Sequence, residues 1–278
     1  MSEQDAEPTP REQLTKAFHE AEKLDTEGEP MESVVTLDTL LTIHRLVGDE
    51  VGAAKATALL AQAFLLDPVL DAPEWNPDQF DFRDADMERA FKRIFDDLTP
   101  FICLYERLRT HLEAERTQRL MTKAVAPVTL PYLGKTFTSH PEVESIDAVR
   151  RDMGTYLGTG DAFEWTEQVS DDGREVKYRF DRCGYVEVLQ AYGLHRAASM
   201  VCYCDHIHFD THTPELYFER EHSIGSGDDY CDHHFILRSP DEEYDEDARY
   251  GDTNGVEYDA RAMIRDWETR YEKGDVSW

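Results

Sequence analysis

The chain has 278 residues, of which 40% are hydrophobic and 11% aromatic. This length is enough for one sizeable hydrophobic core or two smaller ones. Its 59 acidic residues against 29 basic residues give a formal net charge of −30, which excludes the basic surfaces that bind nucleic acids or anionic membranes. Disordered acidic proteins are poor in aromatic residues, so the composition favours a folded protein with an acidic surface.

The expected location is the cytoplasm. No apolar run approaches the roughly 18 residues that a membrane span needs, and Met1–Arg11 is too acidic and polar for a signal peptide. A strongly acidic surface suits a high-salt cytoplasm, where salt shortens the range of charge repulsion to about 3 Å at 1 M. Five cysteines in such a chain are expected to be reduced thiols, not a disulfide framework.

The acidic charge predicts a salt-dependent stability. Because the repulsion among the excess carboxylates must be screened, we expect the melting temperature to rise steeply from low salt to molar KCl. Thermal melts across that range measure the effect. A flat or falling melting temperature would contradict the high-salt interpretation.

The first part of the chain has the apolar spacing of helices. Suitable residues recur over Glu12–Leu24, Glu32–Leu46 and Val51–Leu66. A proline-containing stretch, Asp67–Asp81, then predicts a linker or long loop. Residues 1–81 are therefore expected to form an acidic tail and a helical extension.

Three further helices are predicted before the pattern changes. Proline lacks the amide hydrogen that a helix interior uses, so Pro100 is expected to separate the first two helices. Pro127 and Pro131 are expected to end the second. The predicted ranges are Ala85–Asp97, Ile102–Val125 and Ile146–Tyr156.

The next stretch has the residue pattern of strands. Phe163–Val169 and Glu175–Arg182 flank the turn residues Ser170–Gly173, which predicts a β-hairpin. A proline-free helical stretch, Tyr185–His208, follows, with Gly193 as a dividing point.

A second hairpin is predicted from Glu215–Ile224 and Tyr230–Arg238. The fold class is therefore α+β: N-terminal helices followed by an antiparallel sheet of two β-hairpins that flank a helix. We assign this α+β domain to residues 82–240. Residues 241–278 are expected to be an acidic C-terminal segment with a short helix at Ala260–Tyr271.

Chemically reactive side chains are concentrated in Val201–Arg238. This stretch contains three of the five cysteines and six of the eleven histidines. Thiols, imidazoles and carboxylates carry out nucleophilic, acid–base and metal chemistry. Their density predicts a functional site here.

Several short motifs in and before this stretch resemble those of one family. They are Cys183, Cys202-x-x-Asp205, Phe218-Glu219-Arg220 and Gly227-Asp228-x-x-Cys231-Asp232-x-x-Phe235. Together they resemble the L-2-amino-thiazoline-4-carboxylic acid hydrolase family. The resemblance implies an α+β domain that opens a thiazoline ring by hydrolysis and yields an N-carbamoyl cysteine.

The secondary structure of Ser199–Phe209 decides which side chains meet. In a helix, Cys202, Asp205 and His206 would share one face with Phe209. In a strand, Cys202 and His206 would instead share a face with Cys204 and His208. The helix is favoured because the preceding alanine-rich run lacks β-branched residues.

The residues suggest roles for an enzyme that attacks a C=N carbon. We predict Cys231 as nucleophile or site organiser, with Cys202 beside it and Asp205 and His206 as acid–base groups. Arg220, or alternatively Arg182, could bind a substrate carboxylate through its guanidinium. Cys183, Gly227 and Asp232 complete the set of predicted substrate-binding residues.

Alternative interpretations stay open. No cofactor is favoured, but His206, His208, Cys231 and His233 could bind Zn or Fe, although their spacing matches no standard zinc motif. The cysteines could instead be buried small hydrophobic residues, or the domain could be a non-catalytic small-molecule-binding module whose helical extension binds a partner. We expect a small-molecule substrate with a carboxylate and neither a nucleic-acid nor a membrane partner, and leave open a homo-oligomer.

Overall fold

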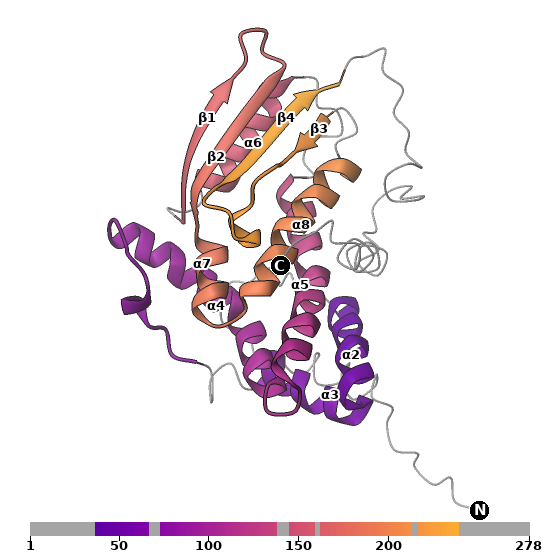
Figure 1. Ribbon diagram of the computed structural model, residues 1–278. Helices are drawn as coiled ribbons and strands as arrows, with labels where there is room; N and C mark the ends of the chain where they lie inside the picture. Colours follow the sequence, from indigo (N-terminus) through magenta and orange to yellow (C-terminus); the bar gives the residue numbers. More distant parts are fainter. Residues whose placement is uncertain (1–36, 67–72, 138–144, 159–161, 213–215, 239–278) are drawn as a thin grey trace, which may run out of the picture. The chain divides into compact units, whose positions relative to one another are not determined.

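A computed structural model describes residues 37–66, 73–137, 145–158, 162–212 and 216–238 (Figure 1). The described residues form two compact units. One unit combines the residues up to Glu74 with Leu98–Val128, and the other combines Trp75–Asp97 with the residues from Thr129 onward. Helices α4 (Ala85–Leu108) and α5 (Ala114–Phe137) each contribute residues to both units.

The first unit contains two helices that the apolar spacing predicted. These are α2 (Leu37–Val51) and α3 (Ala53–Leu60), and a π-helical turn at Ala61–Leu66 extends the second. Gly52 separates them with a φ of 89°, a conformation that glycine adopts with little strain. The predicted helices at Glu12–Leu24 and Ala260–Tyr271 lie outside the described residues.

The boundaries predicted from prolines are wrong. Pro100 lies inside α4, and Pro127 and Pro131 lie inside α5. The chain leaves the helical conformation instead at residues 109–113, which are mostly exposed. Apolar residues on both sides of Pro100 are buried, among them Phe95, Leu98, Phe101 and Ile102. This burial offsets the roughly 3 kcal/mol that a proline costs inside a helix.

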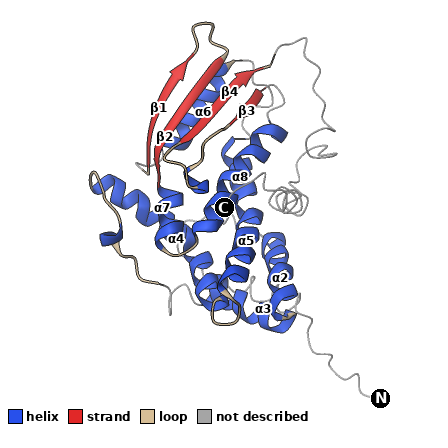
Figure 2. Ribbon diagram, in the orientation of Figure 1, coloured by secondary structure: helices blue, strands red, loops and turns tan. Residues whose placement is uncertain are grey.

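The second unit contains a four-stranded antiparallel sheet with the order β1-β2-β4-β3 (Figures 1 and 2). Both predicted hairpins are confirmed, and pairing of β2 with β4 joins them. The first hairpin turns through Gly173, with a φ of 68°. The strands are β1 (Phe163–Val169), β2 (Glu175–Cys183), β3 (Leu216–Glu219) and β4 (Cys231–Leu237).

One face of this sheet is apolar and buried. In β2 the buried side chains include Tyr178 and Phe180, and their neighbours across the ladder in β4 include Cys231 and Phe235. Helix α6 (Ile146–Gly158), which confirms the predicted short helix, lies behind the sheet in Figure 1 and contacts β2 and β4. The α+β class is therefore confirmed.

The helical segment between the hairpins is divided as predicted. Helix α7 (Gly184–Ala191) ends before Gly193, whose φ of 80° turns the chain into α8 (His195–His212). The helical interpretation of Ser199–Phe209 is thus confirmed, and α8 contacts β3. None of the helices in the described ranges combines the length and apolar character needed to cross a membrane.

Candidate active site

Two cysteines from distant parts of the sequence form a hydrogen-bonded thiol pair. Cys202 lies within α8, and Cys231 is the first residue of β4. Their side chains hydrogen-bond to each other, and both are buried, with exposed fractions of 8% and 5%. The pair lies entirely within the second unit.

The β3–β4 loop (Arg220–Tyr230) contacts both sulfur atoms. The backbone N–H of Ile224 donates a hydrogen bond to Cys231 Sγ at 3.1 Å, and the backbone N–H of Gly225 donates to the Cys202 sulfur. Both residues belong to the 3-10 turn η3 (Ile224–Ser226). One short turn therefore fixes the positions of two thiols from different elements.

The approach of this loop to α8 requires a glycine. A Cβ atom on Gly225 would lie 2.6 Å from Cys202 Sγ and 2.8 Å from the carbonyl oxygen of Ala198. Neither distance is tolerated by a carbon atom, and the second neighbour is backbone that cannot rotate away. The sequence indicated only a turn glycine here, because a close contact with α8 leaves no local pattern.

We expect Gly225→Ala to lower the free energy of unfolding by about 1–3 kcal/mol, the usual cost of overpacking. It should also raise the pKa of the Cys202 thiol, because the loop amide moves away. The matched control is Gly154→Ala in α6, where a Cβ would meet no atom within 4 Å. That change should stabilise the protein by about 0.5–1 kcal/mol. Denaturant unfolding of the two variants measures the change in the free energy of unfolding in each. Equal changes in Gly225→Ala and Gly154→Ala would contradict the close contact.

The environment of Cys202 favours its thiolate. The hydrogen bond from Cys231 lowers the pKa of Cys202 to about 6, against the effect of burial. The charge of Arg220, the nearby Ser223 hydroxyl and the Gly225 amide act in the same direction. The pKa of Cys231 is raised, because its thiol donates the hydrogen bond to Cys202 and because it is buried. The two thiols titrate as one coupled pair, and the contacts of Cys202 favour ionisation of that sulfur.

Two other cysteines of the second unit stay protonated. Cys183, partly buried at the end of β2, has its pKa raised to about 12 by burial and by the charge of Cys202. Burial raises the pKa of Cys204, on the same helix as Cys202, well above its ordinary value. The surroundings of Cys202 therefore lower its thiol pKa, whereas those of Cys183 and Cys204 raise theirs.

Asp205 lies one helical turn beyond Cys202, as the helical spacing predicted. Burial raises its pKa to about 7, and the charge of Arg220 offsets this only in part. The carboxylate keeps 20% of its side chain exposed, and its Oδ2 lies 3.9 Å from Nε2 of His233. Asp205 can therefore exchange a proton near neutral pH.

Arg220 links the carboxylate to the helix that carries the thiolate. Its Nη1 donates to Asp205 Oδ2 at 2.9 Å, and its Nη2 donates to the carbonyl oxygen of Cys202 at 2.5 Å. Only 5% of the side chain is exposed. Arg182, the alternative cation, donates from two nitrogens to the carboxylate of Glu187. Both arginines thus already hold protein partners.

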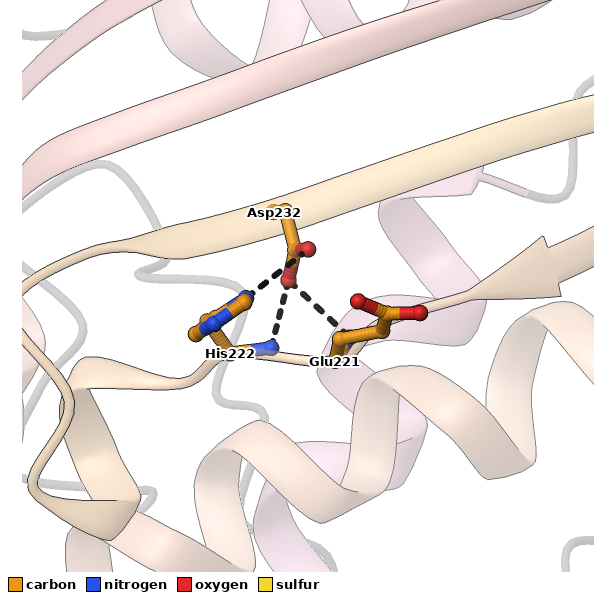
Figure 3. Close-up of side chains that lie close together, drawn as sticks. All are labelled: Glu221, His222 and Asp232. Atoms are coloured by element: carbon orange, nitrogen blue, oxygen red, sulfur yellow. Dashed lines mark hydrogen bonds and ion pairs between the residues drawn. The ribbon is translucent and has the colours of Figure 1, made fainter.

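Asp232 points away from the thiol pair, because successive residues of a strand face opposite sides. Its Oδ1 accepts backbone hydrogen bonds from Glu221 at 3.0 Å and His222 at 2.6 Å, and its Oδ2 lies 3.2 Å from His222 Nδ1 (Figure 3). Burial raises the pKa of Asp232, but these hydrogen bonds outweigh burial and lower it. The carboxylate therefore anchors the start of the β3–β4 loop.

The remaining predicted residues have distinct positions. Gly227 ends η3 in the left-handed region with a φ of 102° and is exposed. His206 and His208 lie in α8, but their side chains are outside the described part of the structure. Of the four candidate metal ligands, Cys231 and His233 share the inner face of β4.

The described residues contain one group with the spacing of a metal site: Glu221, His222 and Asp232, whose ligand atoms lie within 4.8 Å of one another. The Asp232 oxygens already accept three hydrogen bonds from the other two residues. His222 also stacks on the ring of Tyr230, with centroids 4.5 Å apart. These contacts give the group a structural role in the loop.

Sequence reasoning missed the residues that bring the thiols together. Ser223, Ile224 and Gly225 all lie close to one of the two sulfurs. The only available signal was the Gly225-Ser226-Gly227 sequence, which is equally typical of an ordinary turn.

The second unit is an α+β domain that carries a buried thiol pair and, on the same helix as Cys202, the carboxyl group of Asp205. A family model makes the assignment specific: the model for L-2-amino-thiazoline-4-carboxylic acid hydrolase matches residues 87–235. The match covers more than half of the chain, which therefore belongs to this hydrolase family. It begins well before Cys183 and includes β1, β2, β3, most of β4, α8 and the thiol pair. A search of curated proteins finds no match.

Proposed function

We propose that the protein is a thiol-dependent hydrolase that opens a cyclic C=N substrate of the thiazoline type to an N-carbamoyl amino acid. The observation that carries the proposal is the Cys202 thiolate, stabilised by Cys231 and placed one helical turn from Asp205. Membership of the hydrolase family supports the same chemistry.

In the proposed first step, the Cys202 thiolate attacks the C=N carbon of the protonated ring. The ring carbon–sulfur bond then breaks, and the sulfur leaves with the electron pair of that bond. Asp205 supplies the proton that converts the leaving sulfur into a thiol, which suits a carboxyl group with a pKa of about 7. The opened substrate is then bound to Cys202 through a carbon–sulfur bond.

In the second step, water adds to the same carbon and gives one proton to the Asp205 carboxylate. The bond from this carbon to the Cys202 sulfur breaks, and the thiolate is regenerated. The added oxygen becomes the carbamoyl oxygen as its remaining proton passes to solvent. One water is consumed and no redox change occurs, so the products balance.

Cys231 and Arg220 have supporting roles in this mechanism. We propose Cys231 as the organiser and not the nucleophile, because its thiol donates the hydrogen bond that stabilises the Cys202 thiolate. Arg220 acts through Cys202 and Asp205, because its outer nitrogens are bound to them and its side chain is buried. We therefore propose Arg220 as a positioning residue and not as the group that binds the substrate carboxylate.

The test is turnover of 2-aminothiazoline-4-carboxylate by the reduced full-length protein in molar KCl, with oxygen-labelled water. We expect a free thiol to appear together with an N-carbamoyl product that carries one labelled oxygen. A matched ring without the carboxylate should turn over more slowly. Absence of product from both rings, in a protein shown to be folded and reduced, would refute the proposed function.

A further inference from the structure

We propose that Cys202 and Cys231 are a site of reversible oxidative modification, at which a peroxide converts the two thiols into a disulfide. The thiol pair therefore has a second chemistry besides hydrolysis. Formation of the disulfide does not depend on the proposed function. Its consequence for turnover does, because the bond would remove the proposed nucleophile.

Three contacts place the sulfurs together. The thiols hydrogen-bond to each other. Independently, Cys231 Sγ accepts a hydrogen bond from the Ile224 nitrogen at 3.1 Å. Cys202 Sγ packs against the next residue, Gly225, and lies 2.6 Å from the point where a Cβ atom on that glycine would be. Two sulfurs that contact consecutive residues of one turn need only a small movement to reach bonding distance, and each cysteine side chain can rotate about its Cα–Cβ bond.

The oxidation proceeds in two balanced steps. The Cys202 thiolate attacks one peroxide oxygen, the O–O bond breaks, and the products are a Cys202 sulfenic acid and hydroxide. The Cys231 thiol then attacks the sulfenic sulfur, the S–O bond breaks, and water leaves as the disulfide forms. Two electrons pass from the two thiols to one peroxide. The stabilised thiolate of Cys202 assigns it as the sulfur that reacts first.

Burial of the pair makes the modification selective for small oxidants. The exposed fractions of Cys202 and Cys231 are 8% and 5%. Hydrogen peroxide is close to water in size, whereas an aromatic disulfide reagent must bring a ring to the sulfur. We therefore expect peroxide to modify the pair under conditions in which the bulky reagent does not.

The experiment treats the reduced full-length protein with hydrogen peroxide, alkylates the remaining thiols and maps the peptides without reduction. The chain has five free cysteines. We expect a peptide that joins Cys202 to Cys231, loss of two alkylated sites, and full reversal by dithiothreitol. Cys204→Ser is the matched control, because Cys204 is buried on the same helix, and it should form the same crosslink.

A second variant separates the two steps. In Cys231→Ser, Cys202 should be oxidised to a sulfenic acid that a dimedone probe traps, with no crosslink. A crosslink of Cys202 to Cys183, or overoxidation of Cys202 without any crosslink in the wild-type protein, would overturn the inference. If the variant does not fold, the wild-type peptide map still decides. If peroxide forms the crosslink but the reduced protein, assayed before oxidation, turns over no thiazoline, the proposed function alone would be refuted.

Discussion

Cys202→Ala is expected to lower kcat/KM for ring opening by at least about 100-fold, with no recovery at any pH, because the variant lacks the attacking sulfur. Cys231→Ala should also lose about 100-fold near neutral pH, because the thiolate loses its hydrogen-bond donor. In that variant the pH of maximum activity should move upward, because a less stabilised Cys202 thiol ionises at higher pH, while loss of the Asp205 proton still limits activity above about pH 7. Steady-state pH profiles of the two variants measure the difference.

Two control variants separate the loss of a reacting thiol from the loss of buried side-chain volume. Cys204→Ala removes a buried thiol of the same helix, and Cys103→Ala removes a buried thiol of α4. Both should stay active, because neither thiol belongs to the pair. All four variants should lose only about 1–2 kcal/mol of stability, the scale of a small truncation in the core. Residual activity with a raised pH optimum in Cys202→Ala, and loss of activity at every pH in Cys231→Ala, would reverse the proposed roles.

Arg220→Gln is expected to shift both the rising and the falling limb of the kcat/KM profile to higher pH. In the wild-type protein kcat/KM should rise through about pH 6, as Cys202 ionises, and fall above about pH 7, as Asp205 loses its proton. The positive charge of Arg220 lowers both pKa values. Its removal therefore raises both, so the rising and the falling limb move in the same direction.

Arg220→Lys is the matched variant, because it keeps the charge but loses the planar pair of donors. We expect a smaller shift of both limbs than in Arg220→Gln. The thiolate absorbance of each variant, titrated without substrate, should follow the rising limb. A fall in activity with an unchanged pH profile would show a purely structural role or a direct contact with substrate. Melting curves should accompany the kinetics, because loss of a buried ion partner can cost about 3–5 kcal/mol.

The secondary structure was predictable where the signal is local. The turn at Ser170–Gly173 and the division at Gly193 follow from which residues tolerate positive φ. The prolines misled because the free energy that keeps Pro100 inside α4 comes from apolar burial around it. Burial depends on neighbours from other elements, and a residue pattern along one segment does not contain them.

The candidate site, like the secondary structure, was predictable from the sequence only in part. The sequence alone determined that thiols and a carboxylate are concentrated in Val201–Arg238, and it favoured the helix that puts Cys202 and Asp205 on one face. Only the tertiary structure decided which thiol has surroundings that favour ionisation, because that depends on Cys231, Arg220 and the Gly225 amide approaching the Cys202 sulfur. A pKa is set by burial and by the charges and donors nearby. The fold brings these groups together from segments that are distant in the sequence.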